Sequence, residues 1–179
     1  MIMPAQAQQA LRVAIRDATL ADIPDIMRLK VELATSDNIG YTVRATAVDW
    51  ARDGFGPAAH FTIFVAEIPR RTGATPHRVV GIAICAERYY PGWVGPTVAL
   101  LDICVEARFR GQGVGTALLQ KVAQFGKARD SIMIELTMRA GNRAGRLYER
   151  MGFAPVSEAC TYVIAGGALD RLAAPTAAG

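Results

Sequence analysis

Apolar and polar residues along this chain follow two spacings, which together predict interleaved strands and helices. Continuous or every-second apolar positions are typical of strands, and they occur at 11–17, 61–68, 79–86, 98–105, 132–138 and 156–164. Apolar positions three and four residues apart predict helices at 114–125 and 144–151. The run at 98–105 is apolar on both faces except for Asp102, which predicts an interior strand.

Polar residues at the ends of these segments predict where further helices begin. Thr19 with Asp22, and Thr46 with Asp49, have the spacing at which two side chains cap a helix N-terminus reciprocally. These pairs predict helices that end near Ala34 and Gly54. The segments 36–44 and 69–77 are expected to be connectors, and 89–93 to be an aromatic loop.

The resulting element order predicts a single mixed α/β (α+β) domain. A chain of 179 residues is long enough to bury a substantial core, and no internal repeat or linker divides it. We expect residues 1–10 to form a disordered lead, 11–166 the domain, and 167–179 a loose tail.

Composition narrows the classes of function. Charged residues make up 20% of the chain and the net charge is +4, with no basic run that contains interleaved aromatic residues, so nucleic-acid binding is not expected. No apolar stretch reaches membrane-spanning length, and the N-terminus lacks the features of a signal peptide. A soluble protein that binds small anionic ligands fits this balance best.

Cysteine and histidine usage argues against disulfides and metals. Cys85, Cys104 and Cys160 are odd in number and have no C-x-x-C spacing, which indicates reduced thiols and a cytoplasmic location. His60 and His77 have no neighbouring ligand at metal-binding spacing, so we predict no metal site.

A glycine-rich turn follows the apolar run at 98–105 and precedes the helix at 114–125. Such a turn lets backbone amides approach a phosphate at the positive end of a helix dipole. The segment lacks the lysine of a Walker P-loop, and its third glycine has the wrong interval for a dinucleotide-binding fingerprint. A tight turn without a ligand remains the alternative.

The turn and three further segments resemble one known family. The segment 110–115 (RGQGVG) matches the R/Q-x-x-G-x-G/A signature of the GNAT superfamily of acyl-CoA-dependent N-acetyltransferases, and 13–23, 79–83 and 144–153 are similar to other elements of that family in the same order. The resemblance implies a GNAT-like fold: a mixed, mostly antiparallel central sheet, splayed where the coenzyme enters and flanked by about four helices. It also implies acetyl-CoA as the acyl-donor cosubstrate, and a homodimer.

The resemblance further implies which residues hold the coenzyme. Backbone amides of the turn are expected to bind its pyrophosphate, at Arg110, Gly111, Gln112, Gly113, Val114, Gly115 and Thr116. The backbone of Ile103, Cys104 and Val105 is expected to run beside the pantetheine arm, with the Val105 amide donating to the thioester carbonyl. Asn142 is a further candidate, although it precedes Tyr148 by six residues where the family pattern has seven.

Acetyl transfer to an amine requires two proton movements. Tyr148 matches the family's acid position and is our candidate to protonate the departing thiolate; otherwise it is a core aromatic residue. Asp102 is the candidate to accept the amine proton or to orient the ammonium, and a structural hydrogen bond is its alternative. Glu87 and Glu135 are weaker candidates, and a water chain could replace a base.

The substrate is less constrained by the sequence. The segments 50–56 and 89–105 are similar to the spermidine/spermine and diamine acetyltransferase branch, but Leu101 stands where that branch usually has a second acid. We therefore expect a small primary amine, with Tyr89, Tyr90 and Trp93 as candidate pocket residues. The alternatives are a protein N-terminus or lysine side chain, and a non-catalytic acyl-CoA sensor.

Overall fold

The structure is a computed structural model that describes residues 12–36, 42–69, 77–92 and 94–156, together with residues 167 and 169. The expected lead at 1–10, nearly all of the expected tail and all but the first residue of the expected strand at 156–164 lie outside these residues. Most of the expected connectors at 36–44 and 69–77, Trp93 and Cys160 also lie outside them.

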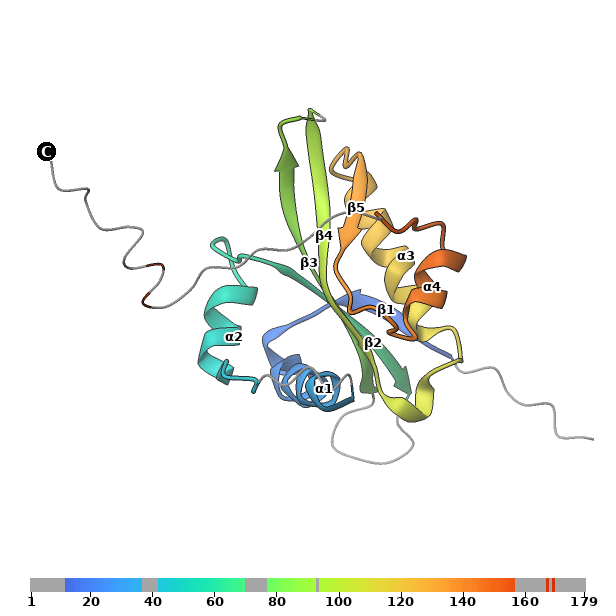
Figure 1. Ribbon diagram of the computed structural model, residues 1–179. Coiled ribbons are helices and arrows are strands. Elements are labelled where there is room, and N and C mark those ends of the chain that lie inside the picture. Colours follow the sequence, from blue (N-terminus) through green and yellow to red (C-terminus); the bar gives the residue numbers. More distant parts are fainter. Residues whose placement is uncertain are drawn as a thin grey trace, which may run out of the picture.

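The described residues of the domain form a sheet of five strands and four α-helices (Figure 1). The strands are β1 (Ala14–Asp17), β2 (Thr62–Pro69), β3 (His77–Tyr90), β4 (Gly95–Val105) and β5 (Met133–Leu136). The helices are α1 (Ile23–Ser36), α2 (Ala47–Gly54), α3 (Val114–Lys127) and α4 (Gly145–Arg150), with short 3-10 turns at η1 (Leu20–Asp22) and η2 (Ala107–Phe109). The predicted fold class is confirmed.

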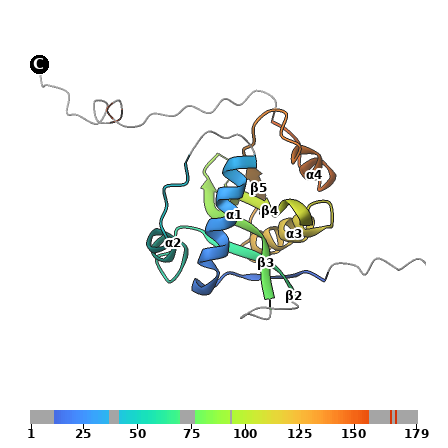
Figure 2. The same ribbon diagram turned by 90° about the horizontal axis from the view of Figure 1, so that it is seen from below.

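The sheet is antiparallel except at one edge, and helices cover both of its faces. Its order is β1-β2-β3-β4-β5, and only the β4–β5 pair is parallel. Helices α1 and α2 lie on one side and α3 and α4 on the other (Figures 1 and 2). Each side has its own core: Ile26, Leu29 and Trp50 pack under the first pair, and Leu118, Val122 and Tyr148 under the second.

Strand ends differ from the predicted ones because pairing decides where a strand ends, as β3 and β5 show. β3 continues past the predicted aromatic loop to Tyr90, since Tyr89 pairs with Pro96 and Tyr90 with Gly95. The prediction that these tyrosines belong to a loop is therefore wrong. β5 is shorter than predicted and stops at Leu136, where its pairing with β4 stops.

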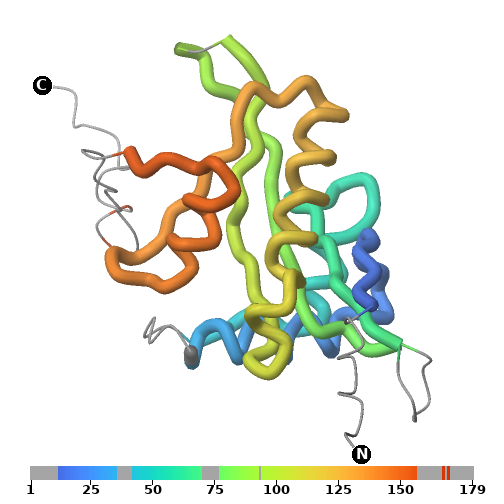
Figure 3. Tube along the Cα trace, turned by 90° about the vertical axis from the view of Figure 1, so that its right-hand side faces the viewer, coloured from blue at the N-terminus to red at the C-terminus, as the bar shows by residue number. Residues whose placement is uncertain are grey.

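The parallel pair β4–β5 opens along its length. Only residues 97–100 of β4 pair with β5, whereas β4 continues to Val105 alongside β3. A bulge marks the change, because Leu100 lies opposite Cys85 and Asp102 opposite Ile84, so that Leu101 is an extra residue. Figure 3 shows β5 and the segment after it moving away from β4. The sheet is thus splayed beside the last five residues of β4.

Both predicted pairs lie at helix starts, but only Thr46 and Asp49 cap reciprocally. The Thr46 N–H donates to the Asp49 carboxylate at 2.8 Å and the Asp49 N–H donates to the Thr46 hydroxyl at 3.3 Å. At the first pair, the Thr19 N–H donates to the Asp22 carboxylate at 2.8 Å, whereas the Asp22 N–H donates to the Thr19 carbonyl at 2.9 Å. Arg16 adds two bonds to Asp22, of 2.7 and 2.9 Å. Burial would raise the pKa of Asp22, but the hydrogen bonds from Arg16 and Thr19 outweigh burial and hold the pKa below its ordinary value.

Replacing Asp22 tests this contribution to stability. A depressed pKa means that the carboxylate stabilises the fold above about pH 4, the ordinary aspartate value, and that this stability is lost as pH falls toward the folded-state pKa. We expect Asp22→Asn to lower the free energy of unfolding at pH 7 by about 1–2 kcal/mol, as for a lost cap. Urea unfolding at pH 7 and pH 3 should show a smaller loss on acidification in the variant than in the wild type.

The matched control is Asp17→Asn, because the Asp17 side chain is 75% exposed and its partner Lys121 is 3.3 Å away. Exposed ion pairs contribute little, so this variant should unfold like the wild type. Equal acid sensitivity of Asp22→Asn and wild type would contradict the assignment.

Candidate functional site

The glycine turn lies between η2 and α3 and has the backbone conformation that requires glycine. Gly111 and Gly113 have φ values of 74° and 85°, in the left-handed region that other residues rarely adopt. A Cβ atom at either position would meet no atom within 4 Å, so the surface of the turn is open. Glycine is therefore favoured at these two positions by the backbone conformation and not by crowding from neighbouring atoms. The open space beside the turn is available to a ligand.

The turn presents unpaired amides at the start of α3. The first helical hydrogen bond runs from the Ala117 N–H to the Gly113 carbonyl at 3.0 Å. The N–H groups of Val114, Gly115 and Thr116 therefore have no carbonyl within the helix to accept them. These donors, at the positive end of a 14-residue helix, form a backbone site suited to a phosphate group.

Two side chains of the motif hold the turn in place. The Gln112 Nε2 donates to the Arg108 carbonyl at 2.8 Å, and the Arg110 Nε donates to the Val105 carbonyl at 2.7 Å. Arg110 also approaches Glu32 of α1 at 3.3 Å. The motif arginine thus fixes the end of β4 against the turn.

Next to the glycine turn, the carboxylate of Glu106 forms ion pairs with three arginines. Glu106, with a side chain only 13% exposed, lies 2.6 Å from Arg108, 2.7 Å from Arg78 and 3.2 Å from Arg28. These arginines come from η2, β3 and α1. Glu106 therefore joins three elements directly behind the turn. Its acceptor capacity matches the forked donors of arginine.

The end of β4 directs its backbone groups alternately to β3 and to the splay. The Glu106 N–H donates to the Val80 carbonyl at 2.9 Å, and Val105 lies opposite Gly81 in the same register. In an antiparallel pair the next residue along directs its N–H and C=O away from the partner strand. The amides of Val105 and Ile103 therefore face the splay, whereas that of Cys104 faces β3.

Asp102 lies beside this open end and is paired. Its Oδ2 accepts a hydrogen bond from Lys30 Nζ of α1 at 2.5 Å. Lys30 therefore supplies the hydrogen bond that a purely structural role for Asp102 would need. The Asp102 side chain is nevertheless 22% exposed to solvent. The two weaker candidates are also paired, Glu87 with Arg129 at 2.8 Å and Glu135 with Arg88 at 3.2 Å, and both lie farther along the sheet.

Helix α4 places Tyr148 next to α3. Tyr148 is 8% exposed, and its ring centroid lies 5.7 Å from that of Phe153. The two helices approach closely because Gly115 has no side chain: a Cβ there would lie 3.1 Å from Leu147 Cδ2. The Asn142 Oδ1 accepts a hydrogen bond from the Ala144 N–H at 2.9 Å, so this side chain supports the start of α4.

The structure does not place Tyr89 and Tyr90 near the glycine turn. Tyr89 lies opposite Pro96, near the tip of the β3–β4 hairpin, and is 60% exposed. Val105 is nine residues farther along β4. At about 3.3 Å per residue this separation is roughly 25–30 Å. Within one chain, the tyrosines therefore lie far from the turn and from the Val105 amide.

Sequence reasoning missed Lys30, Glu106 and Glu32. Lys30 falls at the same helical spacing as Ile23, Ile26 and Leu33, so a charged residue on the inner face of α1 was the available signal. Apart from Arg108, the arginine partners of Glu106 and Glu32 are 28 to 78 residues away in the chain, and no local pattern indicates them.

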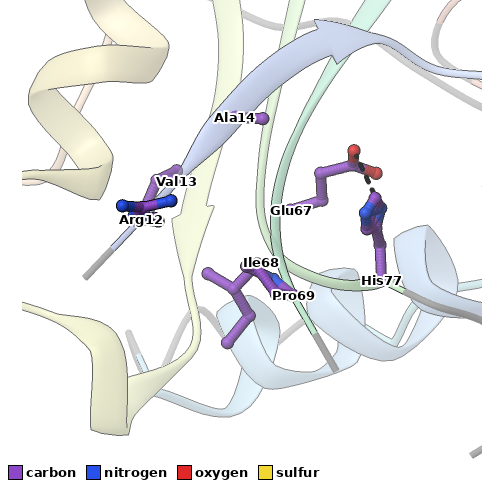
Figure 4. A pocket seen from close by; sticks show the side chains of 7 residues that line it. All are labelled: Arg12, Val13, Ala14, Glu67, Ile68, Pro69 and His77. Atoms are coloured by element: carbon purple, nitrogen blue, oxygen red, sulfur yellow. Dashed lines mark ion pairs between the residues drawn. The ribbon is translucent and has the colours of Figure 1, made fainter. Parts of the chain in front are cut away.

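Other possible sites in the described part of the chain are few. A pocket at the far ends of β1 and β2 contains His77, whose Nδ1 lies 3.4 Å from Glu67 (Figure 4). None of the predicted site residues lines it. No group of described residues could hold a metal ion, and none of the described helices is long and apolar enough to cross a membrane. Cys85 and Cys104 are buried and neither forms a disulfide with a described residue, and burial raises the pKa of Cys85 to about 12.

Comparison with known proteins adds to this geometry. Residues 33–153 match the acetyltransferase (GNAT) family. Mouse thialysine N-epsilon-acetyltransferase is 34% identical over 146 residues, which are 80% of this chain and 85% of the relative. Human spermidine/spermine N(1)-acetyltransferase-like protein 1 is 34% identical over 110 residues, 62% of this chain and 16% of the relative. An integron cassette protein of V. cholerae has the same fold, with a TM-score of 0.68, 20% identity and coverage of 90% and 97%.

Replacing a glycine of the turn tests the anion site. In Gly113→Ala the methyl group would meet no atom of the protein within 4 Å. The φ of 85° at residue 113 is, however, unfavourable for alanine by roughly 1–2 kcal/mol. We expect weaker binding of coenzyme A by about tenfold, because the amides would leave their present directions. Calorimetric titration measures this loss.

Gly92→Ala is the matched control, since a Cβ at Gly92 also meets nothing within 4 Å and its φ is not in the left-handed region. Gly92 lies at the hairpin tip, far from the turn. Binding of coenzyme A unchanged in Gly113→Ala would refute the phosphate site.

Proposed function

We propose, from the premise that this chain belongs to the acetyltransferase (GNAT) family, that it transfers the acetyl group of acetyl-CoA to a primary amine of a small molecule. That it is an N-acetyltransferase follows from the family and from named relatives at about 34% identity. The observation that supports the donor is the row of unpaired amides on the glycine turn beside a splayed sheet.

The residues present fit the donor that the family uses. The amides from Arg110 to Thr116 would hold the pyrophosphate, with Gly113 at the helix start. The backbone of Ile103 and Val105, which faces the splay, would run beside the pantetheine arm, and the Asn142 side chain is a further candidate contact. Acetyl-CoA supplies an activated thioester carbon when it is bound.

The residues of the chain then assist a direct attack in a ternary complex. The amine nitrogen forms the new C–N bond to the acetyl carbon, the C–S bond breaks, and the sulfur takes up a proton. The Val105 N–H would donate to the carbonyl oxygen as negative charge develops. Tyr148 would give its hydroxyl proton to the sulfur, and Asp102, or water beside it, would receive the proton that the amine loses.

A small-molecule acceptor is supported by the relatives, which are named for thialysine and for spermidine or spermine. A protein or peptide amine remains the second acceptor class, and a non-catalytic acyl-CoA sensor is the alternative from a different class. We also propose a homodimer in the cytoplasm, and the buried, reduced thiols of Cys85 and Cys104 are consistent with a reducing compartment.

Tyr148→Phe tests both the mechanism and the enzyme itself. Loss of a general acid should lower kcat by about 10²-fold, at the low end of the usual range because a thiolate leaves readily. The ring keeps its packing against Phe153, so the variant should fold and its affinity for acetyl-CoA should stay unchanged. Thiol release measures turnover, and thermal shift measures binding of the coenzyme.

The outcomes separate the candidates. Full activity in Tyr148→Phe would remove Tyr148 from the mechanism and leave the enzyme standing. A wild-type protein that binds acetyl-CoA but acetylates neither small amines nor peptide amines would favour the sensor.

A further inference from the structure

The ion pair between Lys30 and Asp102 joins two elements on the inner face of α1. Lys30 is 8% exposed and its Nζ lies 2.5 Å from Asp102 Oδ2, so the pair is short and largely removed from water. A buried ion pair is costly to desolvate and is therefore weak evidence for a stabilising role. Its position suggests a role in the site.

The pair stands at the mouth of the splay, across the sheet from α3. Asp102 is the second residue beyond Leu100, the last residue of β4 that pairs with β5. Its carboxylate reaches Lys30 of α1, and it shares the α1 face with Cys104, two residues farther along β4. An acceptor that approached the splay from the side opposite α3 would meet this carboxylate.

One oxygen of Asp102 is available to such an acceptor. Lys30 bonds to Oδ2, and no described residue donates a hydrogen bond to Oδ1. The preceding residue, Leu101, is apolar and 45% exposed. The Asp102 carboxylate therefore faces the Lys30 ammonium through Oδ2 and has an apolar neighbour in the chain.

From these observations we propose that Lys30 is a specificity-determining residue that makes the acceptor site select amines with a single positive charge. The proposal rests on the proposed function. Asp102 Oδ1 accepts an N–H of the acceptor amine, while Lys30 cancels the charge that would otherwise attract a second cation. A diamine must bring its second ammonium toward the Lys30 ammonium in a partly desolvated site, where like charges repel more strongly than in water.

The test compares two acceptors that differ in one charge, putrescine and the aminoalcohol of the same length, aminobutanol. Lys30→Met removes the charge and keeps an unbranched stem, and Lys30→Arg keeps the charge. We expect Lys30→Met to raise the ratio of kcat/KM for putrescine over kcat/KM for aminobutanol by about fivefold. The variant removes the repulsion between Lys30 and the second ammonium of putrescine, and charge pairs that are not fully buried have effects of this order. Lys30→Arg should keep the wild-type ratio.

Lys121→Met is the matched control, because Lys121 forms an ion pair with Asp17 at 3.3 Å at another place on the surface. Its ratio should equal that of the wild type. Thermal unfolding and the affinity for coenzyme A, measured for every variant, report on the fold separately. If Lys30 had only a structural role, Lys30→Met would change kcat/KM for both amines by the same factor. An unchanged ratio therefore overturns the proposal.

Calorimetric binding of the two amines to the protein loaded with coenzyme A gives the same ratio without turnover. If no amine is acetylated but Lys30→Met shifts the binding ratio toward putrescine, the proposed reaction fails and the charge selection stands. If the wild type turns over and neither ratio shifts, only the role of Lys30 fails.

Discussion

The separation of β5 from β4 is the constraint on which the rest of the site depends. β4 stays paired with β3 to its end, but only residues 97–100 have a partner on the other side. Backbone amides near a protein core need partners, so a strand edge left open in this way creates donors for a ligand. The bulge at Leu101 turns the strand at the same point, and the glycine turn and α3 follow directly.

The carboxylates around this opening have partners inside the protein. Glu106 has three arginines, Asp102 has Lys30, and Glu32 approaches both Arg110 and the Ala107 N–H. Among the described residues around this opening, the donors without an internal carbonyl are backbone amides, both those at the start of α3 and those of Ile103 and Val105 that face the splay. The proposed anion site is therefore built from backbone N–H groups.

Local signals explain which parts were predictable from the sequence. The helix starts at Thr19 and Thr46, the glycine turn and the amphipathic pattern of α3 each depend on residues within one segment, and each is present. The extent of β3 and β5 depends on partners elsewhere in the chain, so the alternation of side chains could not give it. Lys30 was not predicted as a site residue, because helical spacing predicts which side of α1 faces the sheet. It does not predict which strand residue contacts a given side chain on that side.

The bonds around Glu106, Gln112 and Arg110 have a consequence for the thermodynamics of coenzyme binding. They fix the turn and the end of β4 before any ligand arrives. A loop that is already ordered does not lose conformational entropy when its ligand binds. Association should therefore follow a lock-and-key course at this end of the site, with a heat-capacity change that reflects buried ligand surface and little folding of the protein.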